Sequence, residues 1–148
     1  MKRSALRRKT ALSRTKTLRK KSLKGTVAEL DGLCRQIVMI RDGFKCRRCG
    51  KDGAGRDGRR VILQSHHIRT KAANACLRFE LDNLLLVCSG CHRFFFHSPD
   101  ALPAAEWYRV NRGQAHLDRL TFLRSVRKGK KLDRGAIKLY LQSLLPQK

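Results

Sequence analysis

The sequence predicts an α+β fold: a small core of two short strands and a helix, stapled by paired cysteines and flanked by further helices. Two observations support this prediction. Two Cys-x-x-Cys pairs frame the middle of the chain, and two short apolar segments lie between them. On both sides of this core, apolar residues recur at helical spacing, which is typical of helices that bury one face.

The N-terminal part is expected to contain a disordered arm and one helix. Residues 1–24 carry eleven Lys and Arg residues and no acid, and they offer too little apolar surface to order themselves. A helix is expected over 26–42, because Thr26 and Glu29 form the pattern of a capping box before an apolar stripe. The domain that follows the arm is predicted to span 25–148.

The core is predicted to cover residues 44–97. Its first strand is expected at 61–65, ending at a pair of histidines, and its second at 84–87. A helix then starts at the second cysteine pair and runs through three consecutive phenylalanines, which we expect to be buried. A helical extension is predicted over residues 100–146, because apolar residues recur there at helical spacing between Gly and Lys-rich breaks.

Four cysteines predict a structural zinc site. Cys46 and Cys49 form one knuckle, Cys88 and Cys91 form the other, and four thiolates complete the closed tetrahedral shell that zinc prefers. A single Cys-x-x-Cys pair is also typical of redox proteins, but the thioredoxin-like βαβ context is missing. A core this small gains on the order of 10 kcal/mol of folding free energy from a bound metal.

The charge of the chain predicts a nucleic-acid partner. Its 35 Lys and Arg residues against 11 Asp and Glu residues give a formal net charge of +24, and neutralising phosphates releases their counterions. No apolar run is long enough for a membrane span, and no secretory signal is visible, so we expect a cytoplasmic protein with reduced thiols. Four arginines that flank the motifs are candidates for phosphate contacts: Arg47, Arg48, Arg69 and Arg93.

Between the cysteine pairs lies a set of polar residues that suits catalysis. His66 and His67 stand at a strand end, Asn83 at a strand start, and His92 directly after the second knuckle. A lone histidine is usually structural. Here the zinc would pull both ends of the segment together, so these side chains can converge.

The motifs CRRCG, QSHHIRT, LRFELDNLLLVCSGCHR and FFFH, over about residues 44–97, resemble the HNH, or ββα-metal, endonuclease family. The pattern is most similar to NinG/Rap-type phage recombination nucleases and related phage HNH proteins. The resemblance implies a ββα-metal core and a metal-dependent endonuclease acting on duplex or branched DNA. It also implies a protein of a bacterial host or its phage.

The resemblance also implies a role for each matched residue. His67 would be the general base, and Asn83 would hydrogen-bond the backbone and fix the loop that aims His67. His66, His92 and His97 would bind one catalytic divalent cation, Mg²⁺, Mn²⁺ or Ni²⁺. Imidazole ligands suit Mn²⁺ or Ni²⁺ better than Mg²⁺.

One alternative class stays open from the sequence. A non-catalytic zinc-knuckle protein that binds nucleic acid needs the cysteines and the positive charge, but it does not need His67, Asn83 and His92 together. The oligomeric state and the preferred DNA are equally open.

Overall fold

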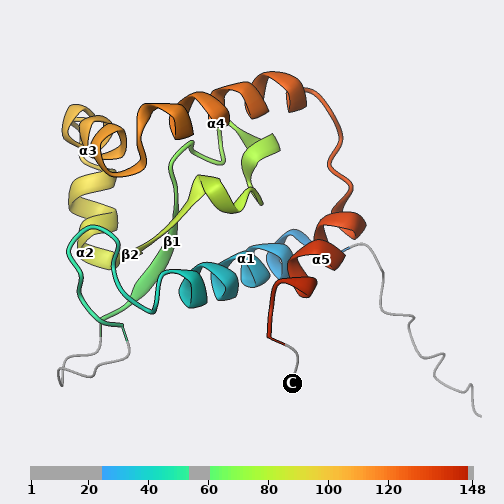
Figure 1. Cartoon of the computed structure of the whole chain (residues 1–148), viewed down its shortest axis with the longest axis horizontal. Helices are drawn as coiled ribbons and strands as arrows, with labels where there is room; N and C mark the ends of the chain where they lie inside the picture. Colours follow the sequence, from blue (N-terminus) through green and yellow to red (C-terminus); the bar gives the residue numbers. More distant parts are fainter. Residues whose placement is uncertain (1–24, 54–60, 147–148) are drawn as a thin grey trace, which may run out of the picture.

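A computed structural model of the chain describes residues 25–53 and 61–146; the arm predicted at 1–24 lies outside them. Its elements, in order, are α1 (Val27–Arg41), β1 (Leu63–His67), the 3-10 turns η1 (Ala75–Leu77) and η2 (Leu81–Asn83), β2 (Leu84–Cys88), α2 (Ser89–Cys91), η3 (His92–Phe96), α3 (Leu102–Arg112), α4 (Gln114–Arg127) and α5 (Arg134–Ser143) (Figure 1). The predicted α+β class is confirmed.

The first helix begins at the predicted capping box. The Thr26 hydroxyl accepts from the Glu29 backbone N–H at 3.1 Å, and the Glu29 carboxylate accepts from the Thr26 backbone N–H at 2.7 Å. One face of α1 is buried, with Leu30 and Val38 fully inaccessible. Val27, at the first position of the helix, is 37% exposed.

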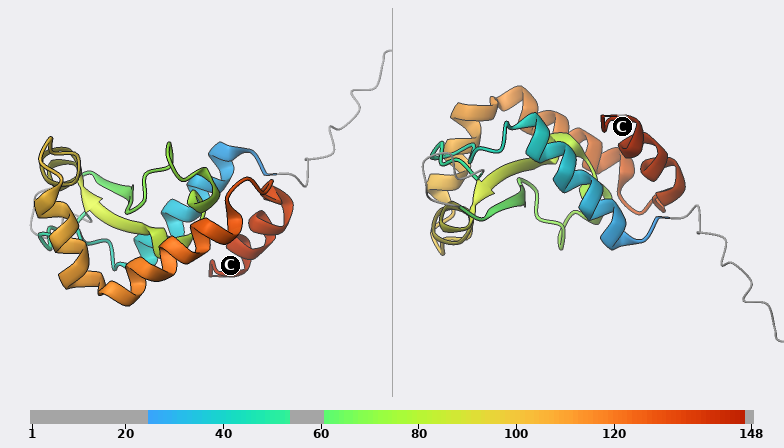
Figure 2. Two further views of the ribbon diagram at one scale, coloured as in Figure 1. Left: turned by 90° about the horizontal axis from the view of Figure 1, so that it is seen from above. Right: turned by 90° about the horizontal axis from the view of Figure 1, so that it is seen from below.

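The two strands form an antiparallel hairpin, with Leu63 opposite Cys88 and His67 opposite Leu84. β1 begins and ends two residues later than the predicted 61–65, so both histidines lie within the strand rather than after it. Every residue of β2 is buried. In Figure 1 the hairpin lies between α4 and α1, and Figure 2 shows α1 crossing it in the view from below.

The C-terminal helices enclose this hairpin. α3 contacts η3, α4 packs along the connection between the strands, and α5 packs against α1. Leu120 of α4 and Leu141 of α5 are fully buried, so each of these two helices contributes an apolar anchor. Within the described residues, no helix has the length and apolar character needed to cross a membrane.

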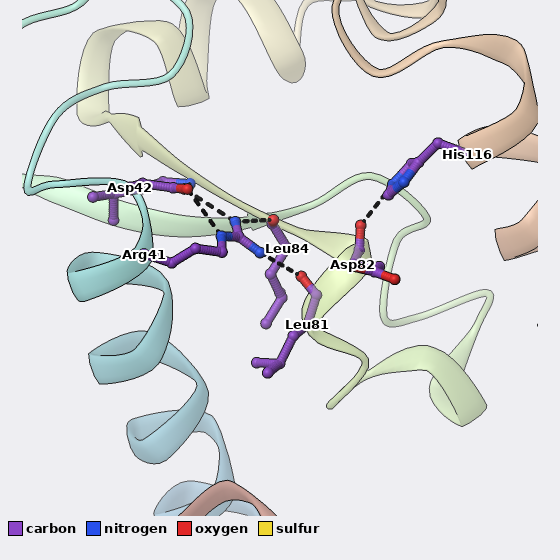
Figure 3. A network of polar contacts seen from close by, with 7 residues as sticks. Arg41, Asp42, Leu81, Asp82, Leu84 and His116 are labelled. Atoms are coloured by element: carbon purple, nitrogen blue, oxygen red, sulfur yellow. Dashed lines mark hydrogen bonds and ion pairs between the residues drawn. The ribbon is translucent and has the colours of Figure 1, made fainter. Parts of the chain in front are cut away.

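Arg41 ties the end of α1 to the start of β2 (Figure 3). Its guanidinium donates to the main-chain oxygens of Leu81 at 2.9 Å and Leu84 at 2.8 Å, and it forms an ion pair with Asp42. On the other side of the same segment, a ring nitrogen of His116 lies 2.9 Å from the Asp82 carbonyl oxygen. These contacts hold the short turn that precedes β2 between two helices.

Candidate active site and metal centres

The four predicted zinc ligands converge. Their sulfur atoms lie within 4.8 Å of one another, and Cys49 Sγ is 3.7 Å from Cys88 Sγ. The first knuckle turns tightly at Gly50, whose positive φ lets its N–H reach the Cys46 oxygen at 2.8 Å. The second knuckle begins where β2 ends. The cluster holds four sulfurs within reach of one ion, the donor set of a structural zinc site.

The thiols of this cluster differ: burial raises the pKa of Cys49 and of Cys91, whereas backbone amides favour the thiolate form of Cys46. Burial disfavours the charged sulfur of Cys46, but N–H groups of Cys49, Cys88 and Arg48 outweigh it and lower the pKa of the thiol to about 7. A thiolate is the form that binds zinc. Cys34 and Cys76 lie outside the cluster, Cys34 in the apolar core.

A second cluster consists of His66, His92 and His97. One ring nitrogen of each lies within 4.8 Å of the others. His66 comes from β1 and is buried, His92 begins η3, and His97 follows it. The structure thus brings together the three residues for which the sequence predicted a shared cation.

A π turn explains how His92 and His97 meet. In a regular α-helix, residues five apart point about 140° away from each other. η3 is instead a π-helix, closed by a hydrogen bond from the His97 N–H to the His92 oxygen at 3.1 Å. Residues five apart then share a face, and the two rings lie 4.5 Å apart.

His66 has one nitrogen engaged and one without a partner. Its Nε2 is 2.6 Å from the Tyr108 hydroxyl, whereas its Nδ1 is buried and has no hydrogen-bond partner within the described part of the chain. Burial, and then the neighbouring charges of His92 and His97, lower the pKa of His66 to about 3. A neutral ring with an unpartnered buried nitrogen fits a metal ligand.

His67 is oriented by a main-chain oxygen. Its Nε2 lies 3.0 Å from the carbonyl oxygen of Arg78, which can only accept, so the proton resides on Nε2 in this contact. The Nδ1 atom keeps its lone pair. Burial lowers the pKa of His67 against the opposing effect of the Arg78 carbonyl, so the ring is neutral near pH 7.

Asn83 fixes the loop that follows His67. Its side-chain oxygen accepts from the Arg69 backbone N–H at 2.7 Å, and its amide nitrogen donates to the Arg69 oxygen at 3.0 Å and to the Leu77 oxygen at 3.1 Å. Its own carbonyl accepts from the Ile68 N–H at 2.9 Å. The side chain is fully buried, and it joins the two ends of the connection between the strands.

His67 and the histidine cluster open into one cavity of about 400 Å³. Its other lining residues are mostly small or polar: Gln64, Ser65, Thr70, Lys71 and Ala72. His67 also lines a smaller pocket of about 190 Å³. This pocket shares Gln64, Ser65 and Lys71 with the larger cavity and adds Arg35. Lys71 therefore places a positive charge beside His67 in both pockets.

The four arginines expected at phosphates occupy different surroundings. Arg48 stacks over the Phe95 ring at 3.6 Å, and Arg69 donates to the Thr121 hydroxyl at 3.0 Å. Arg47 and Arg93 are exposed. Arg69 lines a neighbouring cavity of about 260 Å³ together with His66, His67 and His97. The other three arginines line neither this cavity nor the one of about 400 Å³.

The expected burial of the three phenylalanines is wrong for Phe94, which is 77% exposed. Phe96 alone packs against the core and the ring of His66. Consecutive residues of a helix point in different directions, so three phenylalanines in a row cannot all face the core.

Sequence reasoning also missed two residues near the site. Lys71 lines both pockets beside His67, and Tyr108 contacts His66 from α3. Lys71 follows the QSHHIRT motif directly, which was the one signal available. Nothing in the local pattern pointed to Tyr108, which lies 42 residues from its partner in the chain.

Residues 46–94 match the family model described as HNH endonuclease. The match covers about a third of the chain and includes all four clustered cysteines, both strands, His66, His67, Asn83 and His92. No curated protein and no solved structure matches the chain significantly. The match supports a place in the HNH endonuclease family. His97 and Tyr108 lie beyond the matched segment.

Proposed function

We propose that this protein is a metal-dependent DNA endonuclease that hydrolyses phosphodiester bonds. The observation that carries the proposal is the shared cavity, which His67 and the three clustered histidines line together, while the Arg78 contact occupies Nε2 of His67 and leaves its Nδ1 for a proton. A general base and a cation site in one cavity are the two parts that phosphodiester hydrolysis needs.

In this proposal, His67 is the catalytic base. Its Nδ1 takes a proton from the water that attacks the phosphorus, while the Nε2–H stays bound to the Arg78 carbonyl. Asn83 holds the loop after His67 and so keeps the ring in place. A divalent cation held by His66, His92 and His97 would neutralise charge on the phosphate and on the leaving oxygen.

Structural zinc at the four cysteines is the second part of the proposal. It requires reduced thiols, which supports a cytoplasmic location in a bacterial host or an origin in its phage. The net charge of +24 supports a DNA partner bound through its backbone, with Arg47, Arg48, Arg69 and Arg93 as phosphate contacts. The likeness to NinG/Rap-type recombination nucleases favours branched DNA over plain duplex.

The alternative is a zinc-knuckle protein that binds nucleic acid without cutting it. Under this alternative, two features of the site have no function. The buried His66 Nδ1 has no hydrogen-bond partner among the described residues, and His67 opens into the same cavity as the cluster. A buried unpartnered polar atom costs about 1–3 kcal/mol, which a bound ligand would offset.

The test is to incubate the purified full-length protein with supercoiled, linear and four-way-junction DNA in Mg²⁺, Mn²⁺, Ni²⁺ or EDTA. We expect cleavage with Mn²⁺ or Ni²⁺, weaker cleavage with Mg²⁺ because the ligands are imidazoles, and none in EDTA. Tight binding of all three DNAs without cleavage in any metal would instead establish the non-catalytic alternative.

A further inference from the structure

The metal cluster has a contact from outside the matched HNH segment. Tyr108 belongs to α3, and its hydroxyl lies 2.6 Å from His66 Nε2. This hydroxyl is held in place by aromatic packing. The Phe96 ring stacks on Tyr108 with centroids 5.4 Å apart and on His66 with centroids 4.7 Å apart.

The contact determines which nitrogen of His66 is available to an ion. Nε2 is engaged by the hydroxyl, so Nδ1 is the atom left for the cluster, and it is buried without a partner within the described chain. A nitrogen that binds a metal carries no proton. The single ring proton must then reside on Nε2, and the Tyr108 oxygen must accept it.

The opposite tautomer is incompatible with metal binding. It would place the proton on Nδ1, where it would block the ion and find no acceptor among the described residues. Metal-binding histidines generally donate their other N–H to such an oxygen, which orients the ring and makes the metal-facing nitrogen more basic.

We propose that Tyr108 is a positioning residue for the catalytic cation: its oxygen accepts from His66 Nε2–H and keeps the Nδ1 lone pair directed at the ion. The inference rests on the proposed cation site. It gives the helical extension a role in catalysis, because α3 supplies a group that the HNH segment of residues 46–94 does not contain.

Tyr108→Phe tests this proposal, because it removes the hydroxyl and keeps the stacked ring. Tyr140→Phe is the matched control, since Tyr140 is the other tyrosine of the chain and is 58% exposed. Calorimetric titration of the zinc-loaded full-length protein with Mn²⁺ should show a Kd raised about ten- to a hundredfold for Tyr108→Phe and unchanged for Tyr140→Phe. Thermal unfolding of both variants should stay close to that of the wild type.

Cleavage assays supply a second readout. The Mn²⁺ concentration for half-maximal rate should rise in Tyr108→Phe, while the rate at saturating Mn²⁺ stays near the wild-type value. Wild-type Mn²⁺ affinity in Tyr108→Phe, together with weakened binding in His92→Ala, would overturn the role of Tyr108 alone. Unchanged affinity in His92→Ala would overturn the cation site itself, and the role of Tyr108 with it.

Discussion

The orientation of His67 depends on a chain of contacts that reaches α1. Arg78 supplies the carbonyl that accepts from His67, and its guanidinium makes two hydrogen bonds to Asp31, at 3.0 and 2.6 Å. Asp31 lies on the same helix that buries Leu30 in the core. The first helix therefore anchors the loop whose carbonyl orients the proposed base.

Asp31→Asn should weaken this anchor. The Arg78 hydrogen bonds lower the pKa of Asp31, so its stabilising effect is complete above the unfolded-state value of about 4 and is lost as the pH falls through the lowered value. The pair is about one-third exposed, which limits the effect at pH 7 to about 0.5–1 kcal/mol of unfolding free energy. Urea unfolding of wild type and variant measures it.

A matched control for Asp31→Asn is Glu106→Gln. Glu106 forms the same two-bond contact with Arg109, but within one helix and with both side chains more than half exposed to solvent. This control should be nearly neutral at pH 7. Equal stability of Asp31→Asn and wild type across pH 3–7 would show that the pair contributes nothing.

The elements differ in how far the sequence could predict them. The capping box predicted the start of α1, because the bonds that define it are local. The spacing within each cysteine pair is also local, whereas the meeting of the two pairs was predicted from the four ligands that zinc prefers. Helical spacing could not predict that His92 and His97 meet, since the π turn of η3 changes which residues share a face. The bond from Tyr108 to His66 depends on packing between distant elements, which no local pattern encodes.

Cys46→Ser tests whether zinc bound at the four cysteines stabilises the fold. Removing one thiolate should release the bound zinc and abolish cooperative unfolding, since metal affinity here is folding free energy of about 10 kcal/mol. Elemental analysis and thermal unfolding measure the two effects. Cys76→Ser is the control, because Cys76 is half-buried and outside both clusters, and it should keep one zinc per chain. A folded, active wild-type preparation without zinc would refute the site.

At the scale of the whole molecule, both the net charge and the fold support the proposed activity. The net charge of +24 makes association with a polyanion favourable, and the zinc-stapled hairpin gathers the base and the histidine cluster at one cavity. The helices outside residues 46–94 contribute as well, because α1 anchors the loop behind His67 and α3 contacts His66. The proposed activity is thus a property of the domain as a whole.

The most direct test is the nicking rate of supercoiled plasmid in Mn²⁺ by His67→Ala. Removal of the base should lower the rate at saturating DNA at least about 100-fold, while Mn²⁺ and DNA affinity stay unchanged. His116→Ala is the control, since His116 lies on α4 outside the cluster and its ring contacts a main-chain oxygen, and it should nick at near the wild-type rate. Near wild-type nicking by His67→Ala would contradict the account.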